Sequence, residues 1–158
     1  MSIMEVLSAL GQALKKHQWT LVTAESCTGG GLAYWLTSVP GSSEWFERGF
    51  VTYSNASKQE LLSVKTLTLE KFGAVSEETA REMAEGALSK SLANVSMAIT
   101  GIAGPDGGSP EKPVGTVWFA WKQPTLETQT KKVLLSGNRE EIREQAIRFA
   151  LEQLQACL

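Results

Sequence analysis

The strongest constraint on the fold is an apolar run that ends in a glycine-rich turn, in the stretch Leu21–Gly31 (LVTAESCTGGG). The apolar and β-branched residues predict a strand over residues 20–24, and the residues after the glycines predict a helix over 30–37. A strand that passes through a tight turn into a helix holds the turn's side chains at the edge of a sheet. The turn therefore presents two candidate nucleophiles, Ser26 and Cys27.

The start of that helix is also a candidate anion site. Backbone N–H groups in the first turn of a helix have no acceptor within the helix, so they stabilise a phosphate or a developing oxyanion. This places Thr28, Gly29 and Gly30 among the predicted substrate-binding residues, without deciding between phosphate and oxyanion. A turn whose glycines serve only close packing is the alternative.

Strand and helix patterns alternate along the rest of the chain. Further strands are predicted over residues 45–54, 95–100, 114–121 and 128–135, and helices over 2–16, from Asn55, over 67–72, from Ser76 and from Asn138. The last two strands pair most simply as an antiparallel hairpin. The pattern predicts one α/β domain over residues 1–158, a three-layer sandwich with a mixed sheet of about five strands and helices on both faces.

Composition excludes several classes of function. The net charge is −2 and no basic cluster exceeds a pair, which argues against nucleic-acid binding. The single histidine, His17, and single aspartate, Asp106, make a metal centre hard to build, and we expect no metal and no cofactor. Two cysteines, Cys27 and Cys157, favour a reduced, cytoplasmic setting, and no apolar run is long enough to span a membrane.

A serine nucleophile needs a neighbouring base. His17 precedes the strand whose far end carries Ser26, and such a strand spans roughly 15–20 Å, so the two residues are expected at opposite edges of the sheet. Lys58 follows the second predicted strand, and parallel strands would bring it to the same edge as Ser26. Burial lowers the pKa of a lysine toward neutrality, as a Ser–Lys mechanism requires. Tyr53, at the same end, is expected to orient Lys58 or relay a proton.

The third component is the loop 101–113, which holds four glycines and three prolines between two strands. A long ordered loop of this kind in a small domain is usually functional. Alternatives remain open at each position. Lys112 is the alternate base, Cys27 is the alternate nucleophile with its side chain pointing away from that of Ser26, and Lys58 is otherwise an ordinary exposed helix lysine.

The final helix has a clear apolar stripe. Its predicted inward residues are Ile142, Ala146, Phe149, Ala150, Leu154 and Cys157, and its predicted solvent-facing residues are Arg143, Glu144, Arg148 and Glu152.

Five segments together carry a resemblance to a known family. They are TAESCTGG at 23–30, GSSEWFERGFVTYSNASK at 41–58, GAVSEE at 73–78, TGIAGPDGGSPEKPVGTVWFA at 100–120 and SGNRE at 136–140. In this order they resemble the CinA C-terminal domain family, in its stand-alone nicotinamide-nucleotide amidase form. Asn138 departs from the aspartate expected in the last segment, but asparagine also caps a helix.

The resemblance implies deamidation of nicotinamide mononucleotide to nicotinate mononucleotide and ammonia, within pyridine-nucleotide recycling. It implies catalysis by Ser26 with Lys58 as base and Tyr53 beside them, no metal, and a homodimer. Further substrate-binding residues are expected at Thr100, the last residue of the strand before the loop, and at Gly101, Ala103 and Gly104 in the loop. Arg139 is expected to bind the phosphate. The alternatives are a nucleotide-binding or regulatory module without turnover and a thiol enzyme that uses Cys27.

Overall fold

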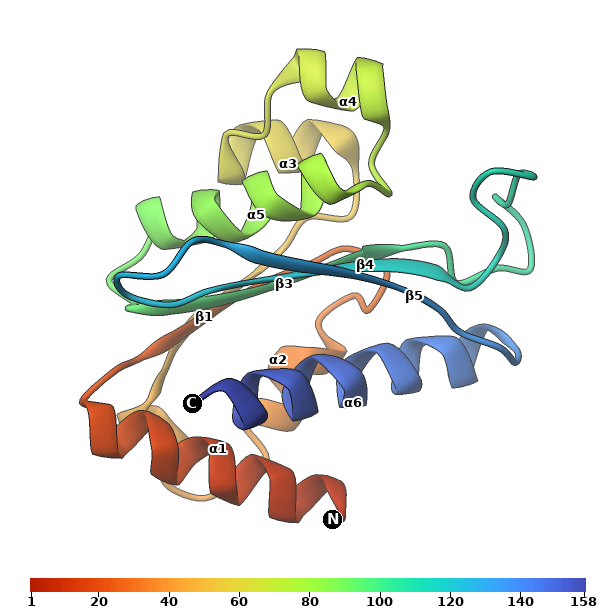
Figure 1. The fold of residues 1–158 in the computed structure, drawn as a ribbon. Helices are drawn as coiled ribbons and strands as arrows, with labels where there is room; N and C mark the ends of the chain where they lie inside the picture. Colours follow the sequence, from red (N-terminus) through yellow and green to blue (C-terminus); the bar gives the residue numbers. More distant parts are fainter.

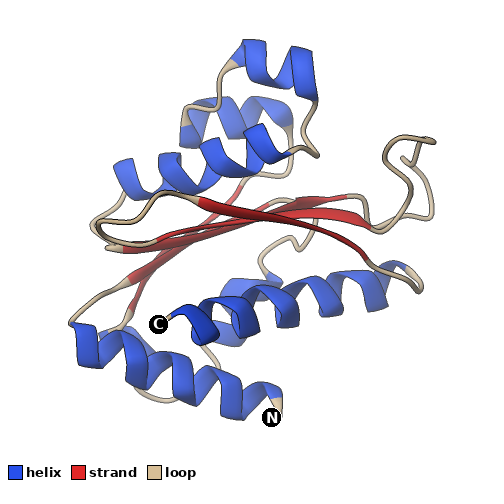
Figure 2. Cartoon of the chain, in the orientation of Figure 1, coloured by secondary structure: helices blue, strands red, loops and turns tan.

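Residues 1–158, all described by a computed structural model, form a five-stranded sheet with a layer of helices on each face (Figures 1 and 2). The order of strands is β2 (Phe46–Val51), β1 (Leu21–Glu25), β3 (Val95–Gly101), β4 (Thr116–Lys122) and β5 (Gln129–Leu134). The first three are parallel, and β4 and β5 pair antiparallel. The predicted three-layer α/β fold with its C-terminal hairpin is therefore confirmed.

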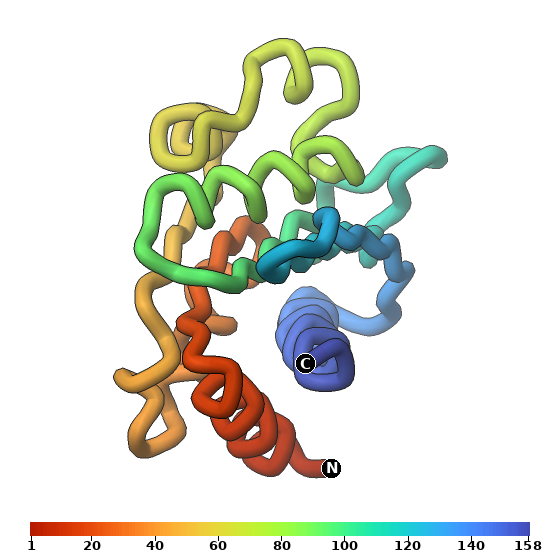
Figure 3. The backbone as a smooth tube through the Cα atoms, turned by 60° about the vertical axis from the view of Figure 1, so that its left-hand side comes forward, coloured from red at the N-terminus to blue at the C-terminus, as the bar shows by residue number.

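Two sets of helices cover the sheet. One face carries α1 (Ile3–His17), α2 (Gly31–Leu36) and α6 (Arg139–Cys157), and the other carries α3 (Asn55–Leu62), α4 (Thr66–Phe72) and α5 (Glu77–Ser89). A short 3₁₀ turn, η1 (Ser42–Glu44), precedes β2. Figure 3, which looks nearly along α6, shows that helix across the sheet from α5. None of these helices is both long and apolar enough to cross a membrane.

The two cores differ in the size of their side chains. Beneath the sheet, α1, α2 and α6 bury leucines such as Leu7, Leu10 and Leu36 against Phe119. Above it, α5 presents alanines, and its Gly86 touches the end of α3, where an added Cβ would lie 1.9 Å from the carbonyl oxygen of Leu62. Small residues thus allow α3 to pack closely on α5. This packing fixes the position of the helix that carries Lys58.

The second strand is shorter than predicted. β2 ends at Val51, because Ser54 leaves the strand to cap α3, where its hydroxyl accepts the N–H of Ser57 at 3.1 Å. The amide of Thr52 still donates to the carbonyl of Glu25 at 2.8 Å, so the chain stays beside β1 until it turns into the helix. A serine N-cap outweighs the strand pattern of the residues before it.

The face of α6 was predicted correctly only in part. Ile142, Ala146, Ala150 and Leu154 are buried, whereas Cys157 is exposed, and the buried Ile147 and Leu151 were not predicted. The prediction that Arg143 faces water is wrong: the residue is half-buried and its guanidinium donates to two backbone carbonyls. α6 packs against α1 and α2 as well as the sheet, so its contact face is wider than one stripe. Asn138 caps the helix as expected, with its side chain accepting the N–H of Glu141 at 2.9 Å.

Candidate active site

Ser26 and Lys58 meet at the carboxyl edge of the parallel strands. Ser26 directly follows β1, and its N–H donates to the carbonyl of Ile99 in β3 at 3.0 Å. Lys58 lies one turn inside α3, and its Nζ is 3.0 Å from the Oγ of Ser26. Side chains alternate between the faces of a strand, which sends Ser26 toward α3 and its neighbours Glu25 and Cys27 toward the opposite layer.

The environment of Lys58 favours a neutral amine. Its side chain is buried, with 1% of the residue exposed, and no carboxylate pairs with it. Burial lowers the pKa of Lys58 to about 8, while the nearby Cys27 acts in the opposite direction. Nζ also donates to the carbonyl oxygens of Thr52 at 2.8 Å and Tyr53 at 3.3 Å. A neutral amine with two N–H bonds committed to these carbonyls directs its lone pair at the hydroxyl of Ser26.

A cavity of about 260 Å³ opens above this pair. It is lined by Ser26, Cys27, Tyr53, Lys58, Ala74, Val75, Thr100, Gly101, Ala103 and Arg139. The cavity is thus reached by Thr100 and Gly101, at the end of β3, and by Ala103 in the following loop, whereas Gly104 does not line it. The Thr100 hydroxyl donates to the carbonyl of Ala74 at 2.8 Å. The rest of the loop extends away from the sheet edge between β3 and β4 (Figure 1).

Tyr53 and Arg139 lie at the mouth of the cavity. The phenol of Tyr53 accepts a hydrogen bond from the guanidinium of Arg139 at 3.2 Å, and Arg139 also donates to the carbonyl of Gly104 at 2.7 Å. Tyr53 is 62% exposed, and its contact with Lys58 runs through its backbone carbonyl while the phenol makes none. No carboxylate pairs with Arg139, so a cation stands at the rim without a protein anion.

The N-terminus of α2 is already occupied by an acidic side chain of the chain itself. The Oε1 atom of Glu25 accepts the hydroxyl of Thr28 at 2.5 Å and the N–H groups of Gly30 at 3.2 Å and Leu32 at 2.9 Å. Its Oε2 atom accepts the N–H of Ala33 at 3.1 Å. The expectation that these first-turn N–H groups are open to a ligand anion is therefore wrong, because Glu25 neutralises the helix end from below the sheet.

Two backbone donors beside Ser26 remain without a partner. The N–H of Gly29 donates to the carbonyl of Ser26 at 3.0 Å, whereas those of Cys27 and Thr28 make no hydrogen bond. Thr28, Gly29 and Gly30 thus form the turn that carries Ser26 but do not line the cavity. Their part in substrate binding stays a prediction, which now rests on the free N–H of Thr28.

Sequence patterns alone missed Glu25 and Arg143. Arg143 donates from Nε to the carbonyl of Cys27 at 3.0 Å and from Nη2 to that of Thr28 at 3.3 Å. Two signals were available. An acid directly before a glycine-rich helix start is placed to cap it, and Arg139, Arg143 and Ile147 follow one another at intervals of four residues on one side of α6.

The alternative catalytic residues lie elsewhere or are inert. The Nζ of Lys112 donates to the carbonyl of Phe72 at 2.6 Å and lies outside the cavity. His17 stacks on Trp19 at a centroid distance of 4.2 Å, at the end of α1. Cys27 belongs to the core beneath the sheet, as predicted from its direction, and burial raises the pKa of its thiol to about 11. No group of three or more His, Cys, Asp or Glu side chains is arranged to hold a metal ion.

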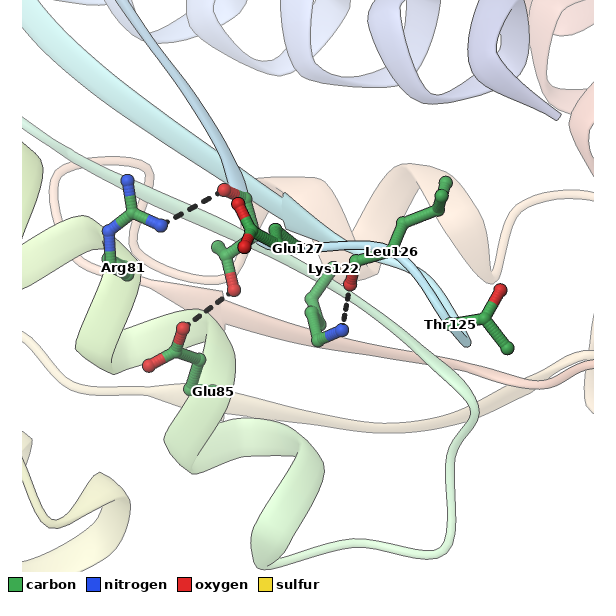
Figure 4. A pocket seen from close by; sticks show the side chains of 7 residues that line it. Arg81, Glu85, Lys122, Thr125, Leu126 and Glu127 are labelled. Carbon is green, nitrogen blue, oxygen red and sulfur yellow. Dashed lines mark hydrogen bonds between the residues drawn. The ribbon is translucent and has the colours of Figure 1, made fainter.

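A larger hollow, of about 530 Å³, lies between α5 and the β4–β5 turn (Figure 4). Its polar groups satisfy one another. Arg81 donates to the carbonyl of Thr128 at 3.0 Å, the Thr128 hydroxyl donates to Glu85 at 2.6 Å, and Lys122 bonds the carbonyl of Leu126. This hollow presents no serine or cysteine beside a buried amine, so the smaller cavity is the candidate active site.

The fold and the site define an α/β sandwich protein with a buried Ser–Lys pair at the carboxyl edge of its parallel strands. The chain belongs to the CinA C-terminal domain family, whose family model matches residues 4–158. It is 51% identical over 152 residues to "Nicotinamide-nucleotide amidohydrolase PncC" of Escherichia coli K12, covering 96% of this chain and 92% of that protein.

Other relatives agree in family and fold. The PncC protein of Pseudomonas putida is 46% identical, covering 96% of this chain and 94% of its own. A crystal structure of the competence/damage inducible protein CihA from Agrobacterium tumefaciens has a TM-score of 0.94 at 46% identity, covering 98% of this chain and 94% of that one. A CinA superfamily protein from Escherichia coli has a TM-score of 0.96 at 44% identity, covering 99% and 91%. The resemblance drawn from sequence motifs is confirmed.

Proposed function

We propose that this chain is a nicotinamide-nucleotide amidohydrolase that converts nicotinamide mononucleotide to nicotinate mononucleotide and ammonia, within pyridine-nucleotide recycling. Relatives that are named for this activity, such as the Escherichia coli PncC protein, are about half identical to this chain over nearly their whole length. The single observation that carries a mechanism is the 3.0 Å contact between the Lys58 amine and the Ser26 hydroxyl inside a buried cavity.

In this mechanism Ser26 is the nucleophile and Lys58 the general base. Neutral Lys58 takes the hydroxyl proton as Oγ attacks the carboxamide carbon, and a tetrahedral oxyanion forms. Lys58 then gives that proton to the leaving nitrogen, the C–N bond breaks, and ammonia departs from an acyl-enzyme. Water, activated by the same amine, cleaves the ester and restores Ser26. A pKa of about 8 supports the role, because an appreciable fraction of Lys58 is then neutral near pH 7.

The size of the cavity and its charges indicate how the nucleotide lies. A volume of about 260 Å³ is enough for the nicotinamide ring at Ser26 and Lys58 but is small for a whole mononucleotide. The ribose phosphate therefore extends over the rim, where Arg139 offers an unpaired guanidinium and Tyr53 a phenol. We assign phosphate binding to Arg139, which the carbonyl of Gly104 holds in place. We assign Thr100, Gly101 and Ala103 to the wall beside the ring.

The test is ammonia release from nicotinamide mononucleotide, compared with nicotinamide riboside and nicotinamide. Purified protein should release ammonia from the mononucleotide. Nicotinamide riboside lacks the phosphate that Arg139 would bind, so its kcat/KM should be at least tenfold lower. Ser26→Ala should abolish release with an unchanged circular dichroism spectrum. Binding of the mononucleotide without ammonia release would instead support the regulatory module.

Three further properties belong to this proposal. Residues 1–158 act as one domain, the protein is cytoplasmic, and it forms the homodimer that the family resemblance implies. Sedimentation equilibrium at micromolar concentration distinguishes a monomer of 17.1 kDa from a dimer.

A further inference from the structure

The free N–H beside Ser26 belongs to a peptide whose orientation is controlled from the other side of the sheet. The N–H of Gly29 donates to the carbonyl of Ser26 at 3.0 Å, so residues 26–29 form a β-turn with Cys27 and Thr28 at its centre. Neither central residue has a positive φ, and Gly29 follows with φ 58°, as in a type I turn. The peptide that joins Cys27 to Thr28 is therefore the central one, whose plane can rotate most easily in a turn.

Arg143 holds this central peptide by its carbonyl. Nε of Arg143 donates to the carbonyl oxygen of Cys27 at 3.0 Å, and Nη2 donates to that of Thr28 at 3.3 Å. In a planar trans peptide the C=O and the following N–H point in opposite directions. With the Cys27 carbonyl turned toward α6, the N–H of Thr28 points away from α6, to the side on which Ser26 faces Lys58.

That N–H is a buried donor with no acceptor. Thr28 is fully buried, at 0% exposure, and its N–H makes no hydrogen bond. A buried backbone N–H without a partner costs about 1–3 kcal/mol and is rare in folded proteins. The donors further along the turn are already bound to Glu25 or to Ser26. The Cys27 and Thr28 amides are thus the two donors in this turn that are left for an oxyanion formed on Ser26, and the Thr28 amide is the one in the peptide that Arg143 holds.

We propose that Arg143 is a positioning residue that fixes the Thr28 N–H as an oxyanion donor. The inference rests on the proposed amidase mechanism and deepens it. Arg143 does not line the cavity, so it acts on the reaction only through the turn. An oxyanion exists in the transition state and not in the bound substrate. Loss of Arg143 should therefore lower kcat and leave KM nearly unchanged.

The test compares Arg143→Ala with Arg148→Ala, the same change five residues along α6. Arg148 pairs with Glu152 at 2.7 Å and has no contact with the turn. Removal of an oxyanion donor costs about 10²–10³ in kcat, so loss of its support should cost about 10- to 100-fold in Arg143→Ala. KM should stay within about threefold, and the pH at which Lys58 titrates in the rate profile should not move. Arg148→Ala should match the wild type.

An inhibitor that mimics the tetrahedral intermediate tests the role of Arg143 without depending on which amide is the substrate. Pyridine-3-boronic acid adds to a reactive serine and places an oxygen where the oxyanion forms. Its affinity should fall at least tenfold in Arg143→Ala and be unchanged in Arg148→Ala. If Arg143→Ala does not fold, Arg143→Lys, which keeps the charge with one donor group, should show an intermediate loss.

Unchanged boronate affinity in the Arg143 variants, a kcat loss below threefold, or a proportional rise in KM would overturn the inference. Failure of the wild type to release ammonia would overturn the amidase proposal and leave the boronate measurement to decide the role of Arg143. The two failures are therefore distinguishable.

Discussion

Glu25 and Lys58 are both buried ionisable residues at one sheet edge, with 1% of each exposed, yet they lie in opposite environments. Below the sheet, Glu25 accepts four hydrogen bonds, from one hydroxyl and three helix N–H groups. Above it, Lys58 has only neutral acceptors, and burial lowers its pKa to about 8. The carboxylate of Glu25 therefore holds the turn in place, whereas the amine of Lys58, which has no carboxylate partner, stays reactive.

This difference gives Glu25 a structural role and Lys58 a chemical one. The consecutive residues Glu25 and Ser26 point to opposite faces, so the turn is held from below while the nucleophile is used above. Buried groups that shift their pKa through desolvation are frequent at active sites. The following predictions test this division, beginning with the largest effect.

Replacement of Lys58 by methionine should remove most of the activity. Without the base, ammonia release should fall by about 10²–10⁴-fold, because Ser26 keeps its proton. The same substitution at Lys112, the alternate base, should lower the rate by less than about threefold, since its amine lies outside the cavity. Initial rates of ammonia release check both variants. Equal losses at the two positions would contradict the assignment of Lys58.

Replacement of Glu25 by alanine should act on stability. The change leaves two buried donors, the Thr28 hydroxyl and the Leu32 N–H, without an acceptor, and each such group costs about 1–3 kcal/mol. We expect the free energy of unfolding in urea to fall by about 2–4 kcal/mol. Glu144→Ala, on the exposed face of α6, should change it by less than about 0.5 kcal/mol. A stability loss from Glu25→Ala as small as that of the control would show that the helix end does not need its carboxylate.

Most of the fold could be predicted because it depends on local patterns. Strand and helix periods and the Ser76 and Asn138 caps follow from short segments, whereas the Ser54 cap was read as part of a strand. The Ser26–Lys58 contact was also predictable, since two strands in parallel deliver both residues to one edge. The roles of Glu25 and Arg143 were not, because each depends on how α2 packs against β1 and α6, and a charged residue at a helix surface is usually exposed.

The comparison also predicts two effects of pH. The pKa of Lys58 is lowered from 10.5 to about 8, so kcat/KM should rise about tenfold per pH unit below 8 and level off above it.

Between pH 8 and 10.5 the unfolded chain binds the proton that the folded chain has lost, so stability rises with pH in that window. Relative to Lys58→Met, the wild type should gain on the order of 3 kcal/mol across it. Rate profiles and urea titrations at each pH measure the two effects, and a profile without a limb near 8 would exclude Lys58 as the titrating base.

The smallest effect is expected at Cys27, which lies on the same side of the sheet as Glu25. Its thiol is buried and burial raises its pKa to about 11, so little thiolate is present at neutral pH. Cys27→Ala should change kcat/KM by less than about threefold and lower stability by about 1 kcal/mol through lost packing. Iodoacetamide should leave the wild type active under the same conditions, since the exposed Cys157 reacts far from the cavity. If iodoacetamide inactivates the wild type but not Cys27→Ala, the nucleophile is the Cys27 thiol. The side of the sheet that carries Glu25 would then be reactive and not only structural.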